Sequence, residues 1–64
     1  MNINDNLNKL IGGRKLSITK IAKESGVHRS TIHKILDGTN VNPGIRTVKK
    51  LADYFGITID ELIR

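Results

Sequence analysis

Five short stretches of the chain carry apolar residues at every third or fourth position, the spacing that places them on one face of a helix. In the first stretch, Asn4 or Asp5 is expected to cap the start of the helix. Gly12-Gly13 is expected to end it, because glycine is unfavourable inside a helix. The apolar positions of this stretch are Ile3, Leu7, Leu10 and Ile11.

The second and third stretches are separated only by a Gly-Val corner. Ser17 is a good N-cap for a second helix, which is expected to bury Ile21 and Ala22. Gly26 can adopt the positive φ angle that a tight corner between two helices requires. The third helix is predicted over about residues 29–36, and it should close at Asp37-Gly38.

The turn-rich linker at residues 39–44 precedes a fourth helix, which is expected to stop at Gly56. Thr58 and Glu61 have the spacing of a capping box, which predicts a short fifth helix. The pattern therefore predicts an all-α fold, a compact five-helix domain over residues 1–64. The fourth helix is expected to bury Ile45, Val48, Leu51, Ala52 and Phe55.

Composition narrows the class of protein. Sixty-four residues without cysteine exclude disulfides and thiolate metal sites, so stability must come from apolar packing or from a partner subunit. No apolar stretch is long enough to span a membrane, and we expect a cytoplasmic protein. Residues 1–50 carry ten Lys and Arg against three Asp and Glu, a net charge of +7, whereas residues 51–64 carry one against three, a net charge of −2. This uneven distribution of charge is typical of a protein that binds phosphate groups with one basic face.

The polar side of the third helix gathers side chains that can reach the edges of DNA bases. A second helix, a glycine corner and such a third helix form the pattern of a helix-turn-helix that reads the major groove. Arg29, in the first turn, can donate to guanine O6 and N7 in a bidentate way. The alternative interpretation is that each of these residues is simply an exposed residue on the helix surface, in contact with water only. The candidates for base contact are His28, Arg29, Ser30, Thr31, His33 and Lys34.

No cofactor, metal or catalytic centre is expected. His28 and His33 would point apart on a helix and have no third ligand nearby, which argues against a metal site. Histidine is also a poor cap, so His28 either bonds a phosphate or leaves the helix to start one residue later. No Ser/His/Asp set, paired carboxylates or glycine-rich phosphate loop is present, so the chain is not expected to be an enzyme.

From Leu7 to Ile63 the chain resembles the Cro/C1-type (XRE-like) helix-turn-helix family of phage repressors and small bacterial regulators. The resemblance implies a lambda-repressor-like domain that binds operator DNA as a dimer without catalysis, in a bacterial or phage-encoded protein associated with the nucleoid. It rests on the order and spacing of Leu16-Ser17, Ile21-Ala22, Gly26-Val27, Ser30-Thr31-Ile32, Gly38, Pro43, Thr47-Val48, Leu51-Ala52, Phe55-Gly56-Ile57 and Asp60-Glu61-Leu62.

The resemblance also implies contacts with backbone phosphates, and it shows two departures. The family often has glutamine at the position of Ile18, where it contacts a phosphate. It often pairs an arginine late in helix 1 with a glutamate late in helix 3; here Ile11 and Leu36 stand at these positions and are predicted to pack together, since replacing both charges is tolerated. The phosphate-contacting candidates are Ser17, Ile18, Thr19, Thr39, Asn40, Asn42, Gly44 and Arg46.

The sequence thus predicts a transcriptional regulator, a repressor, that binds double-stranded DNA with a palindromic operator. Three alternatives stay open: an antitoxin with the same fold, a protein-interaction module that has lost DNA binding (suggested by Ile18), and a lac-repressor-type headpiece. The ending at residues 51–63 favours the Cro/C1 type over the headpiece. A homodimer is expected through apolar residues at the C-terminal end, namely Tyr54, Ile57, Ile59 and Ile63.

Overall fold

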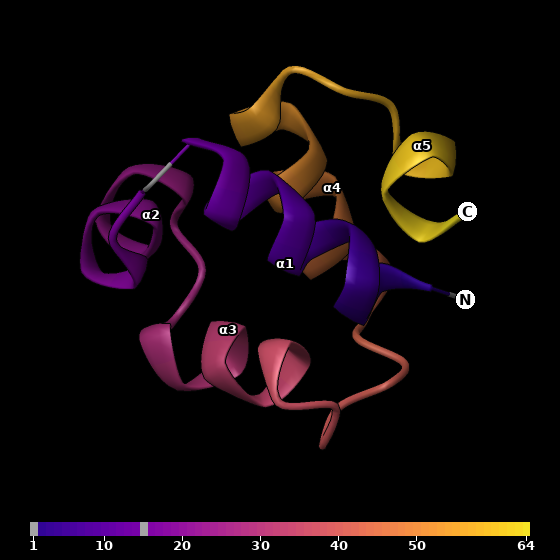
Figure 1. Ribbon diagram of the computed structural model, residues 1–64, viewed down its shortest axis with the longest axis horizontal. Coiled ribbons are helices and arrows are strands. Elements are labelled where there is room, and N and C mark those ends of the chain that lie inside the picture. Colours follow the sequence, from indigo (N-terminus) through magenta and orange to yellow (C-terminus); the bar gives the residue numbers. More distant parts are fainter. Residues whose placement is uncertain (1, 15) are drawn as a thin grey trace.

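The computed structural model of this chain describes residues 2–14 and 16–64, and it contains five helices and no strand among them (Figure 1). The all-α class and the order of elements predicted from the sequence are confirmed. The helices are α1 (Ile3–Arg14), α2 (Ile18–Ser25), α3 (Arg29–Leu36), α4 (Ile45–Phe55) and α5 (Ile59–Ile63).

Helix α1 lies between the other elements: it packs against α3 on one side and α5 on another, while α2 packs against α3 and α4 (Figure 1). The apolar faces of all five helices meet in one core. Burial of each large aliphatic side chain there stabilises the fold by about 1.5–3 kcal/mol. Among the described residues, no polar side chain is buried in this core, which consists of Ile3, Leu7, Ile21, Val27, Ile32, Ile35, Val48, Leu51, Ala52, Phe55 and Leu62.

Local interactions explain where α2 begins and ends and where α5 begins. Ser17 Oγ accepts a hydrogen bond from the backbone N–H of Lys20 at 3.1 Å, as expected of an N-cap. Gly26 closes α2 with a φ of 79°, which only glycine adopts without strain. Thr58 and Glu61 form the predicted capping box, and the hydrogen bonds from Thr58 hold the pKa of the Glu61 carboxyl below its usual value.

Two predictions for α1 were wrong. The helix begins at Ile3, so Asn4 and Asp5 lie inside it, and it runs through Gly12-Gly13 to Arg14. The helix extends past the two glycines because its last residue makes tertiary contacts. The Arg14 guanidinium donates to the backbone oxygen of Phe55 at 3.2 Å and lies 5.3 Å from the centre of the Phe55 ring. These contacts favour the helical last turn more than two glycines disfavour it.

The burial predicted for the start of α4 was also wrong. Ile45 has 67% of its surface exposed. It is the first residue of α4 and follows an exposed segment in which Val41 is 64% exposed, and the buried face of the helix begins only at Val48. Ala22 is half-buried rather than buried, and it packs at the edge of the core.

The asparagines of α1 bond the C-terminal ends of two other helices, which the sequence analysis did not foresee. Asn4 Nδ2 donates to the backbone oxygens of Ile35 at 3.0 Å and Leu36 at 2.7 Å. Asn8 Nδ2 donates to the same Leu36 oxygen at 3.2 Å. The last carbonyls of a helix have no partner within it, so these amides satisfy the end of α3 together with the N–H of Gly38, which donates to the Ile35 oxygen at 3.2 Å.

On the other side of α1, the Asn6 amide bonds the carbonyls at the end of α5. Its Nδ2 donates to the backbone oxygens of Leu62 at 2.8 Å and Arg64 at 3.0 Å, and lies 3.4 Å from that of Glu61. The backbone N–H of Asn2 bonds the oxygen of Ile63 at 2.9 Å. These bonds place the described ends of the chain side by side (Figure 1).

Replacing Gly12 with alanine tests the course of α1. We expect Gly12→Ala to raise the free energy of unfolding, measured by urea denaturation, by about 0.5–1 kcal/mol, because alanine loses less backbone entropy in a helix. Gly12 is exposed, and an added Cβ would meet no atom within 4 Å. The control Gly26→Ala should lower stability by about 1–2 kcal/mol, since its φ is positive. A loss of stability in Gly12→Ala would contradict a helix that passes through this position.

Candidate nucleic-acid interface

The corner between α2 and α3 is built by backbone hydrogen bonds and one buried side chain. The N–H of Gly26 donates to the oxygen of Ala22 at 3.1 Å, and the N–H of Val27 donates to Ser25 Oγ at 3.3 Å. Val27 points into the core, with 5% of its surface exposed. These contacts fix the direction in which α3 leaves the corner. The outside of the corner is a shallow hollow lined by Ala22, Lys23, Gly26, Val27, His28 and Arg29.

Helix α3 has one buried and one exposed side. Ile32 and Ile35 are fully buried. The candidates Arg29, Ser30, His33 and Lys34 are all exposed and, at i, i+1, i+4 and i+5, share one face of the helix. We call these four residues the α3 strip. Of the other two base-contact candidates, His28 is exposed in the corner and Thr31 is half-buried beside the strip.

The N-terminal end of α3 lacks a side-chain cap. His28 occupies the N-cap position and forms no capping hydrogen bond, yet the helix begins directly after it at Arg29, so the expected shift of the start by one residue does not occur. Arg29 Nη1 instead donates to Thr19 Oγ1 on α2 at 3.3 Å. This bond joins a base-contact candidate to a phosphate-contact candidate, and both side chains are exposed. The bond depends on how α2 and α3 pack against each other. The sequence pattern of either helix alone does not predict that packing.

The phosphate-contact candidates fall into two groups, at opposite ends of the α2–α3 unit. Ser17 and Thr19 are exposed at the start of α2, whereas the side chain of Ile18 is half-buried and packs against the core. The apolar residue at this position therefore has a structural role. The second group lies in the segment from the end of α3 to the start of α4; Asn40 is half-buried there, and the exposed members are Thr39, Asn42, Gly44 and Arg46.

Hydrogen bonds between residues two apart shape the segment between α3 and α4. The N–H of Thr39 donates to Asp37 Oδ1 at 2.8 Å, and that of Asn42 donates to Asn40 Oδ1 at 3.2 Å. The hydrogen bonds from Thr39, together with the positive charges of α3, hold the pKa of the Asp37 carboxyl below its usual value. Pro43 is buried, which anchors the segment.

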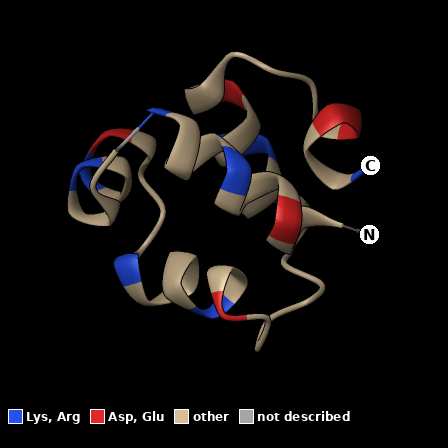
Figure 2. Ribbon diagram, viewed as in Figure 1, with Lys and Arg blue, Asp and Glu red and all other residues tan. Residues whose placement is uncertain are grey.

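Within residues 2–14 and 16–64, the basic residues of the candidate interface form no salt bridge. Both salt bridges found within residues 2–14 and 16–64 lie elsewhere, between Lys49 and Asp53 at 3.2 Å and between Arg64 and Asp60 at 2.6 Å. Arg29, Lys34 and Arg46 thus remain available for an anionic partner. Figure 2 shows basic residues on α2 and at both ends of α3, with one acidic residue on α2 and one just after α3, and further acidic residues on α5 on the far side of the molecule.

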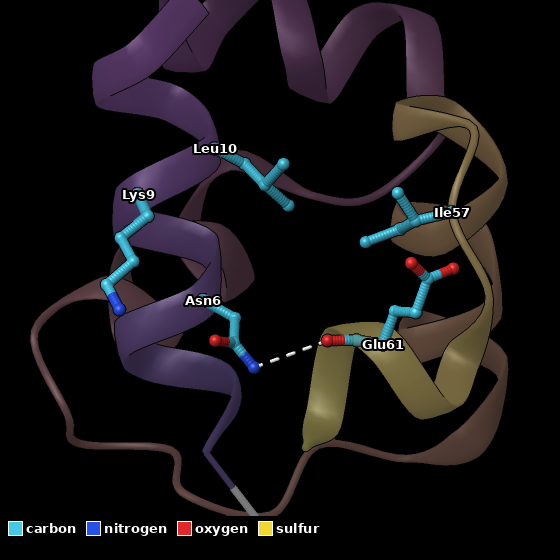
Figure 3. A pocket seen from close by; sticks show the side chains of 5 residues that line it. All are labelled: Asn6, Lys9, Leu10, Ile57 and Glu61. Atoms are coloured by element: carbon cyan, nitrogen blue, oxygen red, sulfur yellow. Dashed lines mark hydrogen bonds between the residues drawn. The ribbon is translucent and has the colours of Figure 1, made fainter.

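A second hollow lies on the α5 side of α1, away from the α3 strip (Figure 3). The Asn6 side chain points toward the backbone oxygen of Glu61 at one end of the hollow, and Leu10 and Ile57 face each other across it. The part of the chain that the structure describes contains no group of three or more metal-ligating side chains. None of its helices has both the length and the apolar character needed to cross a membrane.

The residues predicted to form a dimer contact are half-buried. The Tyr54 hydroxyl donates to Glu24 Oε1 at 2.7 Å, a bond that raises the pKa of the tyrosine, and its ring packs edge-on against that of Phe55. Ile57, Ile59 and Ile63 pack against the core with part of their surface exposed.

Comparison with known proteins gives two matches. A family model described as a helix-turn-helix domain matches residues 4–64. An uncharacterized HTH-type transcriptional regulator of Coxiella burnetii is 31% identical over 61 residues, which are 95% of this chain and 28% of that protein. The chain therefore spans less than a third of the length of this relative. No solved structure matches the chain significantly.

The uncapped start of α3 predicts that His28→Ser stabilises the fold. A serine at this N-cap can accept a hydrogen bond from the first turn of α3, which is worth about 0.5–1 kcal/mol. The free energy of unfolding from urea denaturation measures the gain. Ser17→Ala is the matched control at the capped start of α2 and should lose about 1 kcal/mol. An unchanged or lower stability in His28→Ser would show that the histidine already supports the helix end.

Proposed function

The chain belongs to the XRE-type helix-turn-helix family, and on this premise we propose that it is a sequence-specific transcriptional regulator that places α3 in the major groove of double-stranded DNA. The observation that carries the proposal is the α3 strip, Arg29, Ser30, His33 and Lys34. These side chains are exposed on a helix whose opposite side is buried, so they can meet base edges without disturbing the core.

Arg29 is the principal base contact in this proposal. Its guanidinium can donate to guanine O6 and N7 at once, which discriminates against other bases by about 1–3 kcal/mol. The bond to Thr19 is exposed and long enough to be exchanged for these contacts. Ser30, His33 and Lys34 follow on the same face, and His28 and Thr31 flank them.

Phosphate contacts would flank the strip on both sides. Ser17, Thr19 and the backbone N–H of Ile18 lie at the start of α2, where the helix dipole favours an anion. Thr39, Asn40, Asn42, Gly44 and Arg46 would hold a phosphate on the other side. These contacts fix the orientation of α3 and carry no sequence information themselves.

We further propose that the regulator is a repressor and acts as a homodimer on a palindromic operator, in the cytoplasm of a bacterium and at its nucleoid. Half-sites about one helical turn, ~34 Å, apart would match two copies related by a two-fold axis. The half-buried residues Tyr54, Ile57, Ile59 and Ile63 leave apolar surface for the contact between the copies. An antitoxin would use the same DNA-contacting surface. The packing of Ile18 against the core gives this apolar residue a structural role that is compatible with DNA binding.

Arg29→Ala tests the reading role of α3. Duplexes are first selected by the wild-type chain from a random pool, and Kd values are then measured on a selected and on a scrambled duplex. We expect a loss of about fivefold to 150-fold on the selected duplex and a much smaller change on the scrambled one. Lys9→Ala, which also removes one exposed charge, is the control and should spare the preference. An equal loss of affinity on both duplexes would make Arg29 a phosphate contact only.

The dimer is tested by the spacing of half-sites. A duplex with two selected half-sites one helical turn apart should bind the wild-type chain cooperatively. An insertion of about five base pairs turns the second half-site to the opposite face of the duplex and should abolish cooperativity. Equal binding to both duplexes would contradict a contact between the two copies.

A further inference from the structure

We propose that Asn4, assisted by Asn8, is a positioning residue for DNA recognition: it fixes the C-terminal end of α3 to α1 and so sets the orientation of the α3 strip. The inference rests on the proposed function of α3. It concerns residues outside the DNA-contacting surface, on a helix that the proposed interface does not include.

The hydrogen bonds of Asn4 form a two-pronged clamp. An asparagine amide has two N–H donors, and here Nδ2 reaches two consecutive carbonyls, Ile35 at 3.0 Å and Leu36 at 2.7 Å. Asn8 adds a third bond, to the Leu36 oxygen at 3.2 Å. Asn4 is half-buried, which shields its bonds from competing water.

The rest of α3 is held less firmly. The helix has eight residues, about 12 Å, and its N-cap His28 makes no capping bond. Among the described residues, the side-chain hydrogen bond at the N-terminal end of α3 is the exposed one from Arg29 to Thr19. Ile32 and Ile35 anchor the buried side through apolar contacts, which resist separation but have little directionality. The corner sets where α3 begins, and the side-chain hydrogen bonds that restrain its far end come from Asn4 and Asn8.

A loss of this restraint should affect base contacts and phosphate contacts differently. Bidentate hydrogen bonds to a base require correct angles and distances, so a tilt of α3 weakens them. Attraction to phosphates is mainly Coulombic and tolerates the same tilt. Removal of the clamp is thus expected to reduce sequence preference with little change in non-specific affinity.

The experiment compares Asn4→Ala with Asn6→Ala on a duplex that carries a single selected half-site, so that contacts between two copies do not enter. Asn6 is a matched control because its amide makes the same kind of bonds, at 2.8 and 3.0 Å, to the end of α5 instead of α3. The two variants should lower the denaturation midpoint similarly. The ratio of Kd values on scrambled and selected duplexes should fall about threefold to tenfold in Asn4→Ala and stay at the wild-type value in Asn6→Ala.

Asn8→Ala provides a second test if Asn4→Ala does not fold. It removes the single bond of Asn8 to α3, together with a local bond to the backbone oxygen of Asn4 at 2.9 Å, and should lower the same ratio by a smaller factor. A ratio unchanged in the folded Asn4→Ala variant, or equal losses in Asn4→Ala and Asn6→Ala, would overturn the positioning role, as would an unchanged ratio in Asn8→Ala when Asn4→Ala is unfolded. A wild-type chain without any sequence preference would instead refute the proposed function itself, and the inference with it.

Discussion

The placement of α3 and α5 against α1 depends on hydrogen bonds from the asparagine amides of α1 to the last carbonyls of these two helices. Helices of eight and five residues are too short to be stable alone, and their terminal carbonyls would otherwise have no partner within the helix. Alternate asparagines of one helix supply the missing donors on two of its sides: Asn4 bonds α3, and Asn6 bonds α5. Helix α1 thus joins the proposed reading helix to the C-terminal end.

This arrangement separates the surface proposed to read DNA from the interactions that maintain the fold. Ile32 and Ile35 are buried, and the helix end is bonded by neutral amides, so the cations of the α3 strip are not needed for internal salt bridges. Amide–carbonyl bonds are screened by salt much less than exposed ion pairs are. The orientation of α3 should therefore persist at ionic strengths that weaken its attraction to phosphate.

Much of the fold could be predicted because its signals are local. The caps at Ser17 and Thr58 and the glycine at Gly26 set element ends within a few residues, and the apolar period selected the buried face of α3. The end of α1 could not be predicted, since Arg14 meets Phe55 only after the helices pack. The clamp at Asn4 was missed for the same reason: a surface asparagine has the same local pattern whether or not a helix end lies beside it. The α3 strip could be predicted from the helix-turn-helix motif. Ile11 and Leu36 both pack against the core, and their direct contact with each other stays a prediction.

The central claim, that this domain contacts DNA through α3 and its two flanking segments, is tested most directly by NMR titration of the isotopically labelled chain with a selected duplex. We predict that the largest amide shift changes fall in three segments, residues 17–19, 28–34 and 39–46, and that α5 changes little on a single half-site. Changes centred on α4 and α5, or spread evenly over the chain, would contradict the account.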